Sequence, residues 1–318
     1  MSRLEQLIRD LAVFSEAREM SYNQIAKAMG VGGSTLSEWR KGTYSGDVEA
    51  LNDKVEDFLS RHKYEIKRID FSVDTDVKAR VYYVINTIQK YVSSNVASRL
   101  LESAKIGYIF GRAGLGKTHA IREYIKEYKG RGILVTAESG ITAVGLIKRI
   151  ARELKLDDSG NAETVKTRIR DAIKFTETII IIDEGEHLKP SVIDLVRSIA
   201  DQTGVGVVIA GTESLKSLVF SQKKQYEYLY SRAVVNMTLK DLGIEDTSKI
   251  VRAFLKNEVD LYTEKELQDL INYIDVTVKG SARQLANLLT ASSEIANQNE
   301  SAKITKKHIL AAVTTLAL

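Results

Sequence analysis

The chain has 318 residues, a formal net charge of +4 and no cysteine. This length accommodates two or three domains, and the lack of cysteine excludes disulfides and thiolate metal sites. No run of about 18 apolar residues is present, and the N-terminus has no signal-peptide core. We therefore expect a cytoplasmic protein with no membrane association.

Residues 1–62 predict a small all-α domain of short helices. Ser21 and Gln24 form a capping box, and the next predicted helix has Leu36 and Trp39 on one face. This pattern is typical of a helix-turn-helix DNA-binding domain, whose exposed candidates for groove contact are Ser34, Thr35, Ser37 and Arg40. The segment holds eight Lys/Arg and ten Asp/Glu, a net charge of −2. We therefore expect a weak or auxiliary DNA contact, and a domain for protein contact remains an alternative.

After a linker at 63–75, the pattern becomes that of an α/β protein. Apolar runs short enough for buried strands alternate with helical segments, which is typical of a parallel sheet covered on both faces. The sequence predicts a core over 76–242 with a five-stranded parallel sheet, then a helical domain over 243–318. The predicted strands are 106–110, 132–137, 178–182, 205–210 and 233–238, and the predicted C-terminal helices are 245–256, 263–274, 281–296 and 305–316.

The stretch "GRAGLGKT" at 111–118 lies between a predicted strand and a predicted helix. It matches the phosphate-binding pattern G-x-x-x-x-G-K-[ST] in the required context. Glycines let backbone N–H groups surround phosphate oxygens, and the helix N-terminus adds its positive dipole end. Lys117 is placed to reach the β- and γ-phosphates, and the Thr118 hydroxyl to ligate Mg²⁺. The predicted cofactors are ATP and Mg²⁺, held by Gly111, Arg112, Ala113, Gly114, Leu115, Gly116, Lys117, Thr118 and His119.

The stretch "TIIIIDEGEHL" supports a hydrolytic site. A strand of four isoleucines ends in two acids, Asp183 and Glu184. An acid at this position can hold the magnesium shell, so Asp183 is the second predicted metal ligand beside Thr118. Glu184 can polarise the attacking water as a general base. The order of these motifs predicts hydrolysis of ATP as well as binding.

These motifs together resemble the AAA+ ATPases, and among them the Mu B-type target-selection family of phage transposition. The resemblance covers nearly the whole chain, through "QIAKAMGVGGSTLSEWRKGTYSGD", "GRAGLGKT", "IIIIDEGEHL", "GVGVVIAGTESL", "LYSRAVV" and "KGSARQL". It implies an AAA+ core with a C-terminal helical lid. It implies that Thr212 contacts the γ-phosphate or attacking water, where the family more often has Asn, and that Arg283 contacts nucleotide from the lid. Arg232 would be an arginine finger acting on a neighbouring subunit's ATP, in a ring or helical filament.

The resemblance also implies a function in a bacterial or phage-infected cell. The protein would bind double-stranded DNA with little sequence preference when ATP is present, assemble on it as a homo-oligomer, and deliver it as target to a transposase. ATP hydrolysis would dismantle the assembly. Two alternatives remain: a replication-initiation or helicase-loading ATPase, and an ATP-switched helix-turn-helix transcriptional regulator.

Two predicted helices of the core carry basic faces. Such faces are usually only solvated surface, but repeated along a filament they would follow a phosphate backbone without reading sequence. The candidate DNA contacts are Lys148, Arg149 and Arg152 on the first helix, and Lys166, Arg170 and Lys174 on the second.

Overall fold

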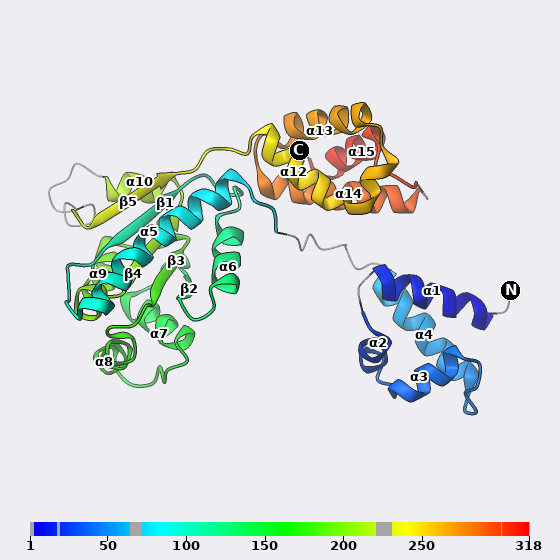
Figure 1. Cartoon of the computed structure of the whole chain (residues 1–318), viewed down its shortest axis with the longest axis horizontal. Helices are drawn as coiled ribbons and strands as arrows, with labels where there is room; N and C mark the ends of the chain where they lie inside the picture. The colour runs from blue at the N-terminus through cyan, green and yellow to red at the C-terminus, as the bar shows by residue number, and fades with distance from the viewer. Residues whose placement is uncertain (1–2, 18–19, 64–71, 221–230, 300, 318) are drawn as a thin grey trace. The chain divides into compact units, whose positions relative to one another are not determined.

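The computed structural model describes residues 3–17, 20–63, 72–220, 231–299 and 301–317 (Figure 1). The chain divides into two compact units, residues 1–68 and residues 69–318. Among the described residues, no helix combines the length and apolar character needed to span a bilayer. Each unit has its own hydrophobic core, so each is described by itself.

In its described residues, the first unit contains four helices around one small core. Its predicted capping box is confirmed, because the Ser21 hydroxyl and the Gln24 side chain each bond the other's backbone N–H. The buried Trp39 indole N–H donates to the Asn52 side chain at 2.8 Å, which satisfies a polar group inside the core. The helices are α1 (Arg3–Ala17), α2 (Tyr22–Ala28), α3 (Gly33–Arg40) and α4 (Val48–Lys63).

The turn between α2 and α3 depends on glycine. Gly30 has a positive φ of 68°, and a β-carbon at Gly33 would lie 2.7 Å from the side-chain oxygen of Asn23. On α3, Ser34 is exposed, whereas the Arg40 guanidinium stacks 3.2 Å from the centre of the Tyr22 ring. Arg40 is therefore already engaged within its own domain.

The second unit contains the predicted five-stranded sheet. All pairings are parallel, in the order β2-β3-β4-β1-β5, which confirms the predicted α/β fold. The edge strand β5 is less buried than the others. The strands are β1 (Ile106–Phe110), β2 (Gly132–Thr136), β3 (Ile179–Asp183), β4 (Gly206–Gly211) and β5 (Ala233–Thr238).

The isoleucines of β3 explain why this sheet is covered on both faces. Ile179 and Ile181 join the core cluster on one face, and Ile180 and Ile182 join the cluster on the other, because side chains alternate along a strand. The first face is covered by α5 (Asp76–Ser98) and α6 (Lys117–Glu127). The second is covered by α7 (Ala143–Glu153), α8 (Ala162–Ile173), α9 (Pro190–Thr203) and α10 (Glu213–Val219).

Two glycines in buried strands allow α5 to lie close to the sheet. A β-carbon at Gly107 would be 2.9 Å from Val84, and one at Gly206 would overlap Ile88. A larger residue at either position would push α5 outward, and α5 begins at the edge of the sheet that carries the glycine-rich loop. The absence of a side chain at Gly107 and Gly206 therefore allows α5 to pack at this position against the sheet.

The chain after β5 is helical in the part that the structure describes, as predicted. Residues 244–316 form the C-terminal bundle, whose core joins that of the first sheet face. One helix prediction in the core is wrong at its end: α8 stops at Ile173, and Lys174 has extended backbone, so Lys174 does not continue the helix face of Lys166 and Arg170. The bundle contains α12 (Ile244–Leu255), the 3-10 helix η3 (Lys256–Leu261), α13 (Glu264–Val278), α14 (Ala282–Gln298) and α15 (Lys306–Leu316).

Candidate nucleotide site

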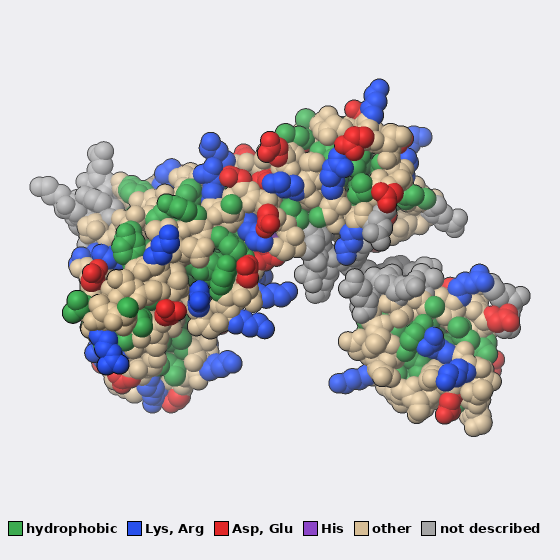
Figure 2. Space-filling view, in the orientation of Figure 1, with side chains coloured by type: hydrophobic (Ala, Val, Ile, Leu, Met, Phe, Trp, Pro, Cys, Tyr) green, Lys and Arg blue, Asp and Glu red, His purple; other side chains and the backbone are tan. Residues whose placement is uncertain are grey.

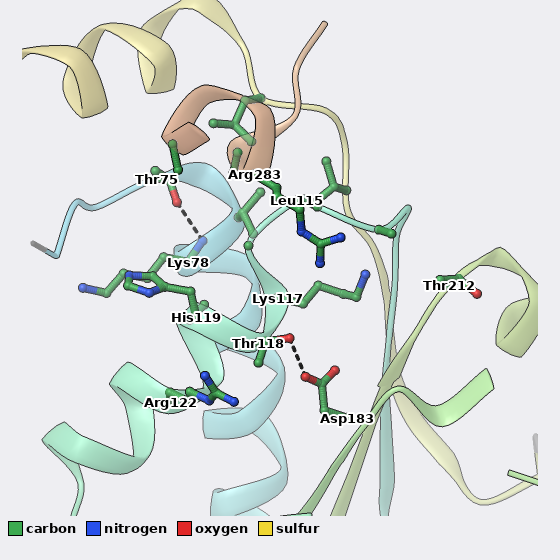
Figure 3. Close-up of a pocket in the computed structure, with 18 of the residues that line it drawn as sticks. Thr75, Lys78, Leu115, Lys117, Thr118, His119, Arg122, Asp183, Thr212 and Arg283 are labelled. Carbon is green, nitrogen blue, oxygen red and sulfur yellow. Dashed lines mark hydrogen bonds between the residues drawn. The ribbon is translucent and has the colours of Figure 1, made fainter. Parts of the chain in front are cut away.

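A cavity of about 430 Å³ lies at the carboxyl edge of the sheet (Figure 3). Its walls come from the loop between β1 and α6, the ends of β3 and β4, the start of α5 and the first turn of α14. A volume of this size is ordinary for a small-molecule or cofactor pocket. The carboxyl edge of a parallel sheet is also where such folds bind ligands.

The glycine-rich loop folds as its sequence predicts. Gly114 and Gly116 have positive φ values of 84° and 96°, a conformation that side chains with a β-carbon disfavour. Gly116 is the residue before α6, so the loop leads directly into the N-terminus of that helix. Backbone N–H groups and a helix N-terminus thus face one cavity, which is the arrangement that holds phosphate.

Lys117 is a cation that the fold has removed from water. Its side chain is buried, with 8% exposed, and its ammonium donates to the carbonyl oxygens of Gly111 at 2.6 Å and Arg112 at 3.0 Å. Burial lowers the pKa of Lys117 below its usual 10.5, and the nearby carboxylates of Asp183 and Glu186 oppose that shift. A desolvated cation in a cavity is a strong indication of an anion site.

Asp183 and Thr118 bring two oxygen ligands together. The Thr118 hydroxyl donates to Asp183 Oδ2 at 2.5 Å, and the other oxygen of Asp183 accepts from the Glu184 N–H at 2.9 Å. Within the described residues no cluster of three or more His, Cys, Asp or Glu could hold a metal by itself. Two hard oxygens suit Mg²⁺, which takes its remaining ligands from phosphate and water.

Glu184 projects from a strained turn at the end of β3. Its φ of 57° and ψ of 38° place it in the left-handed region, which non-glycine residues rarely adopt. Its side chain is 53% exposed, lines the cavity and lies 4.0 Å from His187 Nε2. The turn therefore holds a solvent-exposed carboxylate beside the buried Asp183, a placement that suits a general base acting on water.

Two predicted residues, Thr212 and Arg283, line the same cavity. Thr212 follows β4, and its N–H donates to Glu186 Oε2 at 3.2 Å. Arg283 lies in the first turn of α14, where its N–H donates to the Gly114 carbonyl at 3.0 Å. Figure 3 shows the Arg283 guanidinium directed toward the space occupied by the Lys117 side chain. The C-terminal bundle thus contributes a second cation to the cavity.

Sequence reasoning missed Glu186 and the outer wall of the cavity. Glu186 lies two residues beyond Glu184 and contacts Thr212 only because the chain turns back at Glu184. The outer wall falls within or just after the predicted linker and in the C-terminal bundle. Apart from the Lys78 ammonium and the Thr75 hydroxyl it is largely apolar, so it suits a flat base better than phosphate: Val73, Thr75, Val77, Lys78, Leu242, Ile250 and Ala286.

The other predicted cofactor residues have different surroundings. His119 lines the cavity, with its Nε2 3.6 Å from Glu123. The Arg112 side chain instead reaches Asp241, with 2.5 Å between Nε and Oδ1. Arg232 precedes β5 and is therefore at the amino edge of the sheet, opposite the cavity. A strand of five residues separates these edges by about 16 Å, so Arg232 cannot reach this chain's own phosphate site.

The predicted basic faces of α7 and α8 carry cations that are largely paired. Figure 2 shows Lys and Arg interspersed with Asp and Glu over this end of the core. Arg149 contacts Glu138 at 2.6 Å and the Thr136 carbonyl at 2.9 Å. The other ion pairs here are Arg152–Asp158 at 2.7 Å, Arg168–Asp157 at 3.0 Å, Lys166–Glu163 at 3.4 Å and Arg170–Glu163 at 3.5 Å.

Comparison with known proteins matches the part of the chain that contains the glycine-rich loop and the end of β3. A family model described as an AAA domain matches residues 99–219. A solved structure with a similar fold is the Aeropyrum pernix ORC2 protein in its ADPNP–ADP complexes, with a TM-score of 0.57 and 13% identity over 79% of this chain and 72% of that chain. That similarity concerns the fold alone.

Two curated proteins are similar over most of the chain. One is the Mu-like prophage FluMu DNA transposition protein B of Haemophilus influenzae, 24% identical over 282 residues, which cover 86% of this chain and 92% of that protein. Another is the ATP-dependent target DNA activator B of Escherichia phage Mu, 25% identical over 263 residues, which cover 81% of this chain and 79% of that protein. Both similarities extend well beyond the matched AAA domain.

Proposed function

Because residues 99–219 match an AAA domain, we propose that this chain is an AAA+ ATPase that uses ATP to bind and assemble on double-stranded DNA and to present that DNA to a transposase. The proposal rests on one combination of observations. The buried Lys117 shares a cavity with Asp183 and Arg283, and the chain is similar over about four fifths of its length to a protein named for ATP-dependent activation of target DNA.

We assign the steps of ATP hydrolysis to the groups that line the cavity. Lys117 and the loop N–H groups would hold the phosphates, and Thr118 and Asp183 would hold Mg²⁺, which neutralises charge on the β- and γ-phosphates. Glu184 would orient and deprotonate the attacking water. Arg283 would add positive charge from the C-terminal bundle, and Thr212 lies where it can contact the water or the γ-phosphate.

The assembly is proposed from the position of Arg232. At the amino edge of its own sheet, this guanidinium is too far from the phosphate site of its own chain. As an arginine finger it would act on ATP bound by another copy, and hydrolysis would then require neighbouring subunits. Contacts of this head-to-tail kind produce a ring or a helical filament. Repeated basic helices would then follow the phosphate backbone. The helix-turn-helix predicted in residues 1–62 would be an auxiliary contact, because those residues carry a net charge of −2.

Electron microscopy of the full chain with random-sequence duplex tests this function. Filaments or rings on DNA with ATP, and few without ATP, are the expected result, with Lys117→Ala as the nucleotide-free control. Bare duplex under both conditions would overturn the proposal. Protection of one discrete sequence would instead favour a transcriptional regulator, and co-purification with a helicase would favour a loader.

Replacing Glu184 with Gln separates binding from hydrolysis. We expect Glu184→Gln to bind ATP normally, to hydrolyse it about 100-fold more slowly because the base is lost, and to keep the DNA assembly intact after free ATP is removed. Phosphate release and micrographs after a nucleotide chase measure both effects. Equal hydrolysis by the variant and the unaltered protein would remove Glu184 from the base role.

A further inference from the structure

Arg112 lies in the glycine-rich loop, but its side chain leaves the nucleotide cavity. Its Nε bonds Asp241, and one terminal nitrogen bonds the Lys279 carbonyl. Asp241 is on the segment that leads from β5 into α12, and Lys279 is in the turn between α13 and α14. One guanidinium therefore joins the phosphate loop to the segment that enters the C-terminal bundle and to a turn within the bundle.

Backbone contacts at the same place reinforce this connection. The Leu242 N–H donates to the Gly280 carbonyl at 3.0 Å, which joins the segment between β5 and α12 to the turn between α13 and α14. Gly280 has a φ of 70°, and a β-carbon there would lie 2.6 Å from the β-carbon of Asp241. The segments thus approach closely beside Arg112. Three residues after Gly280, the Arg283 N–H donates to the Gly114 carbonyl of the loop.

We propose that Arg112 and Asp241 form a latch that positions the C-terminal bundle, and with it Arg283, over bound nucleotide. The inference rests on the proposed ATP site and adds a positioning residue to it. Arg283 reaches the cavity only if α14 keeps its place against the loop. Opening the latch would free the bundle to move away, and nucleotide would leave faster.

The chemistry of the guanidinium explains why this position has arginine. Its planar fork presents several N–H donors in fixed directions, so it can bond a carboxylate and a carbonyl on different segments simultaneously. A lysine ammonium on its flexible stem is less suited to hold both. Arg112→Lys should therefore behave as an intermediate between the unaltered protein and Arg112→Ala.

Dissociation of a fluorescent ADP from the full chain, chased with unlabelled ADP, measures the latch. We expect Arg112→Ala and Asp241→Ala each to raise the dissociation rate about fivefold, which corresponds to about 1 kcal/mol. The double variant should be no faster than Arg112→Ala, because Arg112→Ala already removes the contact with Asp241. Asp241→Ala leaves the loop sequence unaltered, so it separates the latch from any damage to the loop.

Arg252→Ala is the matched control. Arg252 pairs with Glu264 at 2.5 Å between α12 and α13, with exposure similar to that of the Arg112–Asp241 pair, but both partners are inside the bundle. It should leave nucleotide dissociation unchanged. Arg112→Ala indistinguishable from Arg252→Ala, or additive effects of Arg112→Ala and Asp241→Ala, would overturn the latch.

A second measurement needs no nucleotide and so tests the latch separately from ATP binding. The chain has no cysteine, so spin labels can be placed only at introduced cysteines, at the exposed positions Lys126 on α6 and Lys265 on α13. Asp241→Ala should broaden the distance distribution between the labels while the melting temperature changes by less than about 2 °C. An unchanged distribution would show that the bundle does not depend on the latch.

Discussion

The nucleotide cavity and the surface of α7 and α8 use Lys and Arg in opposite ways. Lys117 is buried, and its ammonium bonds backbone carbonyls in place of a neutralising acid. Arg152 has a side chain that is 65% exposed and pairs with Asp158. Burial of a cation in a cavity costs free energy and indicates an anion-binding site, whereas exposed ion pairs contribute little to stability and form on many surfaces. A buried cation such as Lys117 therefore indicates a ligand-binding site, whereas an exposed, paired cation such as Arg152 does not.

The largest expected effect comes from removing the buried cation. Lys117→Ala should abolish detectable ATP binding and reduce hydrolysis at least about 100-fold, because the charge acts in a water-excluded cavity. Fluorescent nucleotide titration and phosphate release measure the two losses. Lys126→Ala, an exposed lysine on the same helix, is the control and should keep full activity. Hydrolysis by Lys117→Ala at the normal rate would show that the buried cation of the cavity is no more important for activity than the cations on the surface of α7 and α8.

A second test asks whether the cations of α7 and α8 bind DNA, although three of the four replaced here pair with acidic side chains. We propose a variant with Gln at Lys148, Arg152, Lys166 and Arg170. If all four contact phosphate, the slope of log affinity against log salt should fall by about 3 to 4, since each contact contributes about 0.9. Affinity for random duplex with ATP, measured across a salt series, gives the slope.

The matched control removes the same charge elsewhere. Gln at the exposed lysines Lys126, Lys129, Lys265 and Lys307 changes the net charge equally. It should leave the slope nearly unchanged if binding is local to α7 and α8. Equal slopes for the two variants would mean that these helices only contribute general charge, and DNA contacts would have to be sought on other surfaces.

The pH dependence of stability offers a smaller test of the buried cation. Because burial lowers the pKa of Lys117 below 10.5, the unfolded chain holds this proton more tightly than the folded chain as pH rises toward 10.5. The free energy of unfolding should therefore rise with pH across that window. Lys117→Met buries no charge at this position, so at neutral pH its free energy of unfolding should exceed that of the unaltered protein. This difference in the free energy of unfolding should become smaller as pH increases. Denaturant titrations at several pH values measure the difference, and a constant difference would contradict it.

The smallest expected effect is on an exposed pair. Arg152→Ala removes the pair with Asp158 and should lower the free energy of unfolding by less than about 0.5 kcal/mol. Denaturant unfolding of the variant beside the unaltered protein provides the measurement. A loss above about 2 kcal/mol would show that this pair has a structural role, and the contrast with the cavity would then be weaker.

Prediction from sequence succeeded where the determinants are local. The five strands are short apolar runs, and the glycine-rich loop is eight consecutive residues between a strand and a helix, so both patterns can be read without distant contacts. Asp183 is equally local, since it ends the isoleucine strand. The structure brings Lys117, Thr118, Asp183, Glu184, Thr212 and Arg283 to one cavity, as the sequence predicts.

Prediction failed where distant segments meet. Arg112 reads as a phosphate-loop residue, yet its partner Asp241 lies 129 positions away. Val73 and Thr75 lie in the predicted linker, and they join the cavity wall only because α5 begins beside the loop. Lys174 was misplaced for another reason: a helical repeat does not reveal at which residue the helix ends.

The location of Arg232 at the amino edge of the sheet has a kinetic consequence. If its guanidinium completes the site of another copy, one isolated subunit would bind ATP without hydrolysing it. Turnover per subunit would then fall as the protein is diluted, while the fraction with nucleotide bound would not. DNA that gathers subunits would accelerate hydrolysis by raising their local concentration, so the polymer would begin consuming its own stabilising ligand as soon as it forms.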